Sequence, residues 1–136
     1  MSFDTKIVIV IRSDLALWQK MNVTAFLAGG VAAMYPECIG DPYEDASGNS
    51  YSRLIGQPIL IYSAERAELT RALDRALVRE VRPAIYTEDM FSTYDDVANR
   101  EVVRRVPRAD LNLVGLAIRA EKKTVDKIVD KLKLHP

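Results

Sequence analysis

The chain has 136 residues, of which 49% are hydrophobic and 28% are charged, and its formal net charge at pH 7 is zero. This length suits one domain around one hydrophobic core, and the composition excludes a disordered chain. The zero net charge excludes an overall basic field that would attract nucleic acid, so no DNA partner is expected.

The cysteine content and the lengths of the apolar runs indicate the cellular location. Cys38 is the only cysteine, so an internal disulfide is excluded, as in most proteins of reducing compartments. No apolar run reaches the roughly 20 residues of a membrane span. The start, MSFDTK, lacks the basic-then-apolar order of a signal peptide. We therefore expect a cytoplasmic protein that forms one domain over residues 1–136, without a membrane partner.

The first third of the chain predicts a buried strand, a turn and an apolar helix. Residues 6–11, KIVIVI, form an uninterrupted β-branched run, which is typical of a strand covered on both faces. After a turn, residues 18–35 have a helical pattern that is apolar almost all round, so this helix is expected in the core or at a subunit interface. Gly29 and Gly30 each cost a helix about 1 kcal/mol relative to alanine, which predicts close approach of another backbone.

Residues 37–56 are polar and contain several glycines, and no element is predicted there. Long structureless loops are uncommon in compact domains and tend to be functional or mobile. The acidic residues suggest a calcium loop, but Gly48 follows Asp45 too closely for the EF-hand pattern. We therefore expect a solvated loop and no metal site.

The rest of the chain alternates between strands and helices. Ser63 is placed to cap the second helix, with Glu65 in its first turn. The predicted elements, in the order strand, helix, strand, helix, strand, helix, are residues 57–62, 64–80, 83–87, 93–103, 111–118 and 121–132.

This alternation predicts an α/β fold with a mostly parallel sheet of four strands and helices on both faces, a three-layer sandwich. In such sheets, ligands bind at the carboxyl ends of the strands. The polar residues that follow the first three strands should therefore line one cleft: Arg12, Ser13, Asp14, Ser63, Thr87, Glu88 and Asp89.

Four short segments resemble the type 2 peptidyl-tRNA hydrolases. KIVIVIRSDL, at residues 6–15, with Lys20 beyond it, is similar to the opening of that family. GQP at residues 56–58, YTEDM at 86–90 and KIVDKLKL at 127–134 resemble later segments. WQKMNVTAFLAGG, at residues 18–30, is most similar to a bacterial family of domains of unknown function that shares the hydrolase fold.

The resemblance implies a mixed sheet with an antiparallel last strand, a homodimer, and metal-free cleavage of the ester between a peptide and tRNA. Lys20 and Asp89 match two of the family's catalytic residues, and no cofactor is implied. The family's catalytic histidine falls at Leu27 or Ala28, and a preceding glutamine falls near Thr24, so both are replaced. The only histidine, His135, is expected on a loose end.

Four further residues are candidates for substrate contact. Arg12 and Asp14 follow the first strand, where a local brace is favoured over contact with a substrate. Asn22 and Thr24 are polar positions on an otherwise apolar helix that would line the cleft.

Other features favour structural roles. Cys38 has no nearby base for nucleophilic catalysis. The arginines at positions 100, 104, 105 and 108 are interleaved with acidic residues, which favours a solvated face with salt bridges over an RNA site. Trp18 either covers a hydrophobic pocket or anchors the helix.

Two functions remain open. The first is hydrolysis of an ester or amide, of the peptidyl-tRNA type, through Lys20 and Asp89. The second is a non-catalytic module that binds a small molecule or a peptide in the same cleft. The missing histidine weakens the first, because a hydrolase that activates water needs a group with a pKa near neutrality.

Overall fold

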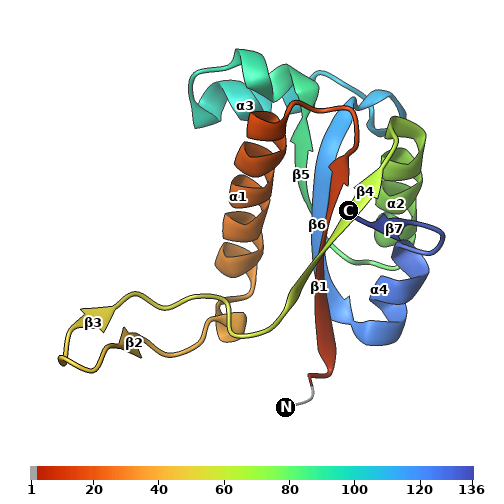
Figure 1. The fold of residues 1–136 in the computed structure, drawn as a ribbon. Coiled ribbons are helices and arrows are strands. Elements are labelled where there is room, and N and C mark those ends of the chain that lie inside the picture. Colours follow the sequence, from red (N-terminus) through yellow and green to blue (C-terminus); the bar gives the residue numbers. More distant parts are fainter. Residues whose placement is uncertain (1–2) are drawn as a thin grey trace.

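The structure is a computed structural model that describes residues 3–136; the first two residues, part of the start tested above for a signal peptide, lie outside the described residues. Figure 1 labels the helices and strands. In chain order they are β1 (Thr5–Arg12), α1 (Leu17–Met34), β2 (Tyr43–Glu44), β3 (Ser50–Tyr51), β4 (Ile59–Ala64), α2 (Arg66–Val78), β5 (Ala84–Thr87), α3 (Asp96–Arg104), β6 (Leu113–Glu121), α4 (Lys122–Ile128) and β7 (Lys133–Leu134). Short 3₁₀ turns occur at η1 (Pro36–Cys38), η2 (Glu88–Ser92) and η3 (Arg108–Asp110).

The main sheet has five strands in the order β5–β6–β1–β4–β7. β1 pairs in parallel with β4, whereas β6 runs antiparallel to both β1 and β5. The α/β class, the mixed sheet and the antiparallel β6 are therefore confirmed. The prediction of four mostly parallel strands is wrong, because within residues 3–136 only one pair of the main sheet is parallel and β7 adds an edge strand on β4.

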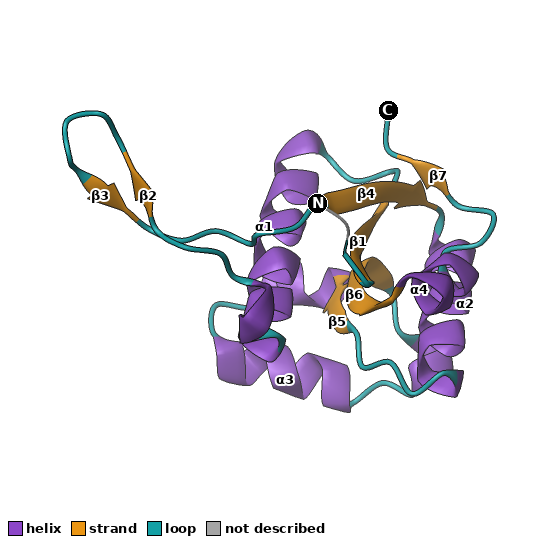
Figure 2. Ribbon diagram, turned by 90° about the horizontal axis from the view of Figure 1, so that it is seen from below, coloured by secondary structure: helices purple, strands orange, loops and turns teal. Residues whose placement is uncertain are grey.

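β1 is buried on both faces, which explains its uninterrupted β-branched run. Val8 and Val10 point to the side of α2 and α4, and Ile7, Ile9 and Ile11 point to the side of α1. All five side chains are at most 1% exposed. Figure 2 shows the same division, with α1 and α3 on one side of the strands and α2 and α4 on the other.

Gly115 of β6 allows α1 to lie directly on the sheet. A Cβ atom at this position would lie 2.6 Å from Val23 Cγ1 and 2.8 Å from Leu27 Cδ1. The predicted close approach at Gly30 is a side-chain contact, since a Cβ there would lie 3.2 Å from the Cβ of Ala84. At Gly29 a Cβ would meet nothing within 4 Å, so the chain's own fold does not require a glycine there.

The predicted cap of α2 is wrong. Ser63 pairs with Lys133 inside the sheet, and α2 begins at Arg66. Glu65 is the residue before the helix, and its backbone N–H donates to the Glu68 carboxylate at 2.9 Å. An acceptor on the first turn thus satisfies an N–H group that the helix itself leaves free.

Residues 37–56 form an ordered hairpin rather than the expected structureless loop. The β2–β3 pair is closed at its base by hydrogen bonds from Gly40 N–H to Leu54 O and from Gly56 N–H to Cys38 O. Residues 41–54, called the arm below, are all exposed and project away from the body (Figures 1 and 2). Within residues 3–136, no helix has the length and apolar character needed to cross a membrane.

Candidate functional site

The carboxyl ends of β1, β4 and β5 lie at one edge of the sheet. β1 and β4 are parallel, and β5 points the same way because both β5 and β1 are antiparallel to β6. Ligand sites of open α/β sheets form at such an edge. The polar residues at this edge do not share one cleft. One group forms a hydrogen-bonded network around Arg12, a second is a pair on one flank of α1, and a third lines a groove on the other flank of α1.

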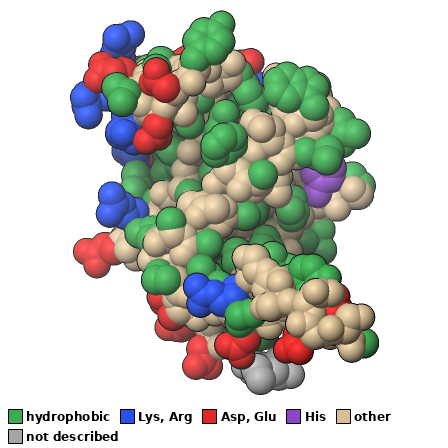
Figure 3. Space-filling view, turned by 90° about the vertical axis from the view of Figure 1, so that its left-hand side faces the viewer, with side chains coloured by type: hydrophobic (Ala, Val, Ile, Leu, Met, Phe, Trp, Pro, Cys, Tyr) green, Lys and Arg blue, Asp and Glu red, His purple; other side chains and the backbone are tan. Residues whose placement is uncertain are grey.

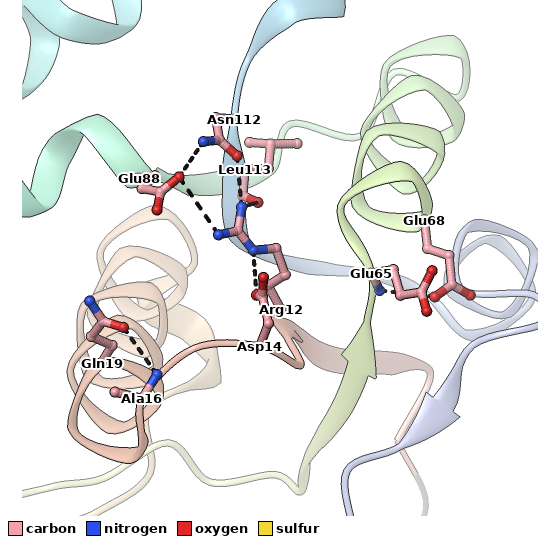
Figure 4. A network of polar contacts seen from close by, with 9 residues as sticks. All are labelled: Arg12, Asp14, Ala16, Gln19, Glu65, Glu68, Glu88, Asn112 and Leu113. Carbon is pink, nitrogen blue, oxygen red and sulfur yellow. Dashed lines mark hydrogen bonds and ion pairs between the residues drawn. The ribbon is translucent and has the colours of Figure 1, made fainter.

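Arg12 is at the centre of the network, where it is only 8% exposed. Its Nε donates to Asp14 at 2.7 Å, and a terminal guanidinium nitrogen donates to Asn112 at 2.7 Å. Glu88 lies 3.7 Å from the other terminal nitrogen (Figure 4). The predicted Arg12–Asp14 brace is therefore present, and it also ties the end of β1 to the segments beside β5 and β6.

The pair consists of Lys20 and His135, whose Nζ and Nε2 atoms lie 3.1 Å apart. His135 is held in place, because its backbone N–H donates to Ile61 O at 2.8 Å. The expectation of a loose end is thus wrong at His135. Asp89 is exposed in η2, and within residues 3–136 no hydrogen bond or ion pair joins it to Lys20.

β7 brings His135 into the sheet. The chain turns at Lys131, whose φ of 74° is left-handed, and Leu134 then pairs with Tyr62. The alternation in KLKL, residues 131–134, is the strand signal that could have revealed this. Leu132 also fits the apolar stripe of the preceding helix, so the sequence pattern extends that helix to residue 132 and predicts no strand after it.

Asn22 and Thr24, the two polar candidates on α1, have different surroundings. Thr24 Oγ1 donates to Lys20 O at 2.6 Å, so its hydroxyl is bound to its own helix. Asn22 is exposed and lies about 200° around the helix axis from Lys20, at the groove beside α3. The two flanks of α1 therefore carry separate groups of polar residues.

The groove lies between α1, β5, η2 and α3, and its volume is about 720 Å³. Aromatic rings dominate one wall. The ring centroids lie 6.0 Å apart for Trp18 and Phe91, 5.3 Å apart for Tyr86 and Phe91, and 5.8 Å apart for Phe26 and Tyr86. The lining residues are Trp18, Asn22, Phe26, Leu27, Gly30, Ala84, Ile85, Tyr86, Met90, Phe91, Thr93, Tyr94, Asp95, Asp96 and Asn99.

The carboxylates of the groove's two acidic residues already have partners within α3. Asp95 accepts the backbone N–H of Ala98 at 2.7 Å, and Asp96 forms an ion pair with Arg100 at 2.5 Å.

Asn22 and Tyr86 supply free polar groups. Within the described residues, neither the Asn22 amide nor the Tyr86 hydroxyl has a hydrogen-bond partner. Burial raises the pKa of Tyr86 above its usual value, so its hydroxyl remains a neutral donor at physiological pH. The groove thus combines aromatic walls with two uncharged polar groups.

Cys38 and the arginine cluster have structural surroundings. Cys38 is 6% exposed, and burial raises the pKa of its thiol, which disfavours the reactive thiolate. The four arginines form the predicted salt-bridged face. The pairs are Arg100–Asp96, Arg104–Glu101, Arg105–Glu101 and Arg108–Asp74.

Asp45, part of the acidic segment considered for calcium, organises the tip of the arm. Its carboxylate accepts hydrogen bonds from the Tyr51 hydroxyl at 2.6 Å and from the Asn49 backbone N–H at 3.0 Å. These bonds lower the pKa of Asp45 to about 2. Among residues 3–136, no group of three or more His, Cys, Asp or Glu side chains is placed to hold a metal ion.

Comparisons with known proteins match almost the whole chain to uncharacterised proteins. A family model described as "Protein of unknown function (DUF2000)" matches residues 5–136. The solved structure of a protein of unknown function from Agrobacterium tumefaciens strain C58 has 44% sequence identity and a TM-score of 0.97, covering 99% of this chain and 100% of that chain. No curated protein sequence matches the chain.

Proposed function

Because the chain belongs to the DUF2000 family of proteins of unknown function, we propose its function from the site itself: the protein is a binding module. The ligand is a small, flat apolar molecule or an apolar side chain of a peptide. It occupies the groove between α1 and α3.

The single observation that carries this proposal is the aromatic groove. Ligand sites have volumes of about 300–1,000 Å³, mostly apolar linings and few polar groups. The groove, at about 720 Å³, has this character. Trp18, Phe26 and Phe91 offer ring faces and edges for stacking, which favours flat ligands.

The polar groups of the groove support binding rather than catalysis. The Asn22 amide can donate and accept hydrogen bonds, and the Tyr86 hydroxyl can do the same. Both are uncharged near neutral pH, and the two aspartates are held by α3. A ligand with one amide or hydroxyl group beside its apolar part fits this arrangement.

The test is a titration of the purified protein with N-phenyl-1-naphthylamine, a neutral aromatic probe that fluoresces when it enters an apolar site. We expect saturable binding at one site per chain. Phe91→Ala should weaken it at least tenfold, because it removes the ring that contacts both Trp18 and Tyr86.

The matched control is Val78→Ala, which truncates an apolar side chain that is 80% exposed at the end of α2. This variant should bind the probe like the wild type. Thermal unfolding of both variants checks that each is folded. Absence of saturable binding to the wild type, or equal binding by a folded Phe91→Ala variant, would contradict the proposal.

A second candidate is hydrolysis of an ester or amide, for which the Lys20–His135 pair is the specific observation. An ammonium group stabilises a developing oxyanion, and a histidine with a pKa near neutrality activates water. In this candidate His135 has the role that Leu27 and Ala28 cannot fulfil. Asp89, which resembles the hydrolases' aspartate, would orient the substrate or the water.

Release of tRNA from a peptidyl-tRNA tests this candidate. Turnover that is lost in His135→Gln and in Lys20→Met would support it, and Asp89→Asn tests the third residue. The control is Lys133→Met, which removes an exposed lysine of β7. A folded wild type without turnover eliminates this substrate.

We also propose the finer fold and the location. The parallel β1–β4 pair and the antiparallel β6 support a three-layer sandwich of the type 2 peptidyl-tRNA hydrolase kind. The single, buried cysteine supports a cytoplasmic protein, which is testable by fractionation of cells that express it.

A further inference from the structure

The charged side chains that line the groove between α1 and α3 all have one sign. Among the described residues of its lining, Asp95 and Asp96 carry carboxylates, and none is a lysine, an arginine or a histidine. Figure 3 looks onto the side of the molecule formed by α1 and α3, where charged side chains gather beside hydrophobic ones in the upper part. The groove is therefore acidic as well as aromatic, although the formal net charge of the whole chain is zero.

The partners of the two carboxylates within α3 do not cancel this charge. Asp95 accepts the backbone N–H of Ala98 through Oδ1, and a backbone N–H group brings no formal charge. Within residues 3–136, Oδ2 of Asp95 has no hydrogen-bond partner. Asp96 pairs with Arg100, but their side chains are 79% and 60% exposed, and ion pairs this exposed are weak. Asp95 in particular remains able to bind a cation.

The aromatic rings of the groove are suited to the same charge. The face of an aromatic ring attracts cations, and tryptophan attracts them most strongly. Trp18 and Tyr94 line the groove and are 63% and 101% exposed, so their rings are accessible. The ring planes of Trp18 and Phe91 are inclined by 66°, and those of Tyr86 and Phe91 by 48°. Rings inclined in this way can contact a compact cation from more than one direction.

Tyr86 is an independent indication that this groove holds a ligand with a polar group. The residue is only 7% exposed and lines the groove, yet its hydroxyl has no hydrogen-bond partner within residues 3–136. Buried tyrosine hydroxyls usually have a partner. The oxygen can accept a hydrogen bond from an ammonium group, which has only donors to offer.

We propose that the ligand of the groove is an organic cation, an arylalkylamine in its protonated form. Its aromatic part stacks on the rings of the groove, and its ammonium group binds at the rim with Asp95 and the exposed ring faces. This inference rests on the proposed binding function and adds the charge of the ligand to it. An anion of the same shape should be disfavoured, because like charges at a binding site repel.

The arginines of α3 do not reverse this preference. Arg100 and Arg104 line a second cavity of about 480 Å³, and neither is among the residues that line the groove. Arg104 also has a partner of its own, since it pairs with Glu101 at 2.8 Å. The groove itself therefore offers charge complementarity to a cation only.

The test compares three small ligands of similar shape and different charge: 2-phenylethylammonium, 2-phenylethanol and 3-phenylpropanoate. Each is titrated separately into the purified protein while the indole N–H signal of Trp18, the only tryptophan, is followed by nuclear magnetic resonance. We expect the ammonium ion to bind about fivefold more tightly than the alcohol, because the ring faces and the carboxylate both attract its charge. The carboxylate ligand should bind most weakly.

Asp95→Asn tests the contribution of the carboxylate at the rim. Asparagine caps helices about as well as aspartate, so α3 should be retained, and thermal unfolding checks the fold. The measured quantity is the ratio of the affinities for the ammonium ion and the alcohol, which should fall by at least half. The matched control is Asp41→Asn on the exposed arm, which changes the net charge equally and should keep the wild-type ratio.

Failure of this inference differs from failure of the proposed function. If N-phenyl-1-naphthylamine and 2-phenylethanol bind but the ammonium ion binds no more tightly than the alcohol, the preference for a cation is overturned and the groove remains a binding site. If neither the probe nor any of the three ligands binds, both proposals are overturned. An unchanged ratio in a folded Asp95→Asn variant overturns the placement of the ammonium group at this carboxylate.

Discussion

Thr87 carries an unsatisfied polar group at the end of β5. The residue is 2% exposed, and its Oγ1 atom is buried without a hydrogen-bond partner among the described residues. A buried hydroxyl without a partner costs a protein about 1–3 kcal/mol. Thr87 lies at the carboxyl edge of the sheet but is not among the residues that line the groove, so its hydroxyl is not assigned to ligand binding.

Thr87→Val should therefore stabilise the protein. The substitution keeps the side-chain shape and removes the unsatisfied hydroxyl, so we expect the free energy of unfolding to rise by about 1 kcal/mol. Urea unfolding monitored by circular dichroism measures the change. Thr93→Val is a contrast, since it removes a hydroxyl that donates to Met90 O at 2.9 Å and should destabilise the protein. A loss of stability in Thr87→Val would show that the hydroxyl is satisfied.

Residue pairs differ in how well the sequence predicts them. The Arg12–Asp14 contact was predicted because the two residues are neighbours after a strand. The Lys20–His135 contact was not, because it depends on the register of β7 on β4. The Lys20–Asp89 pair was suggested by resemblance, yet within residues 3–136 no hydrogen bond or ion pair joins the two residues. Local contacts follow from spacing, whereas long-range ones follow from strand order.

The arm is the element with the clearest pH response. The Tyr51 and Asn49 hydrogen bonds lower the pKa of Asp45 from 3.8 to about 2. Because the pKa of Asp45 is lower in the folded protein than in the unfolded chain, these bonds stabilise the arm tip fully at pH values above the unfolded pKa of 3.8. That stabilisation is lost as the pH falls through the folded pKa of about 2.

We therefore expect the Asn49 amide signals to shift toward disordered positions between about pH 4 and pH 2 in nuclear magnetic resonance spectra. Tyr51→Phe removes the strongest of these bonds and should move the transition to higher pH. Signals from the buried amides of β1, a strand without carboxylates, provide an internal reference in the same spectra. An unchanged midpoint in Tyr51→Phe would contradict this assignment.

The contact between α1 and β6 depends on Gly115. A Cβ there would lie 2.6 Å from Val23 and 2.8 Å from Leu27, both in the core. Gly115→Ala should therefore destabilise the protein by about 1–3 kcal/mol, as overpacking does elsewhere. Adding Leu27→Ala should make the two losses less than additive, because it frees space for the new methyl group. Additive losses in urea unfolding would show that the contact relaxes in another way.

Elements were predicted where a pattern was long. The uninterrupted β-branched run of β1 and the apolar stripe of α2 gave correct elements, because burial is continuous along β1 and recurs at helical spacing along α2. β2, β3 and β7 have two residues each, too few for a period to appear. Ser63 was assigned as a cap from its position alone, whereas pairing with β7 keeps it in the sheet.

At the scale of the whole molecule, α1 separates three surfaces. One flank carries Lys20 and His135, the other lines the aromatic groove, and the side between them, with Met21, Ala25, Gly29 and Ala33, is exposed. The sequence predicted the sheet edge at which these surfaces meet, because alternation of strands and helices determines where carboxyl ends gather. It could not predict their separation, which depends on how α1 is rotated about its axis on the sheet.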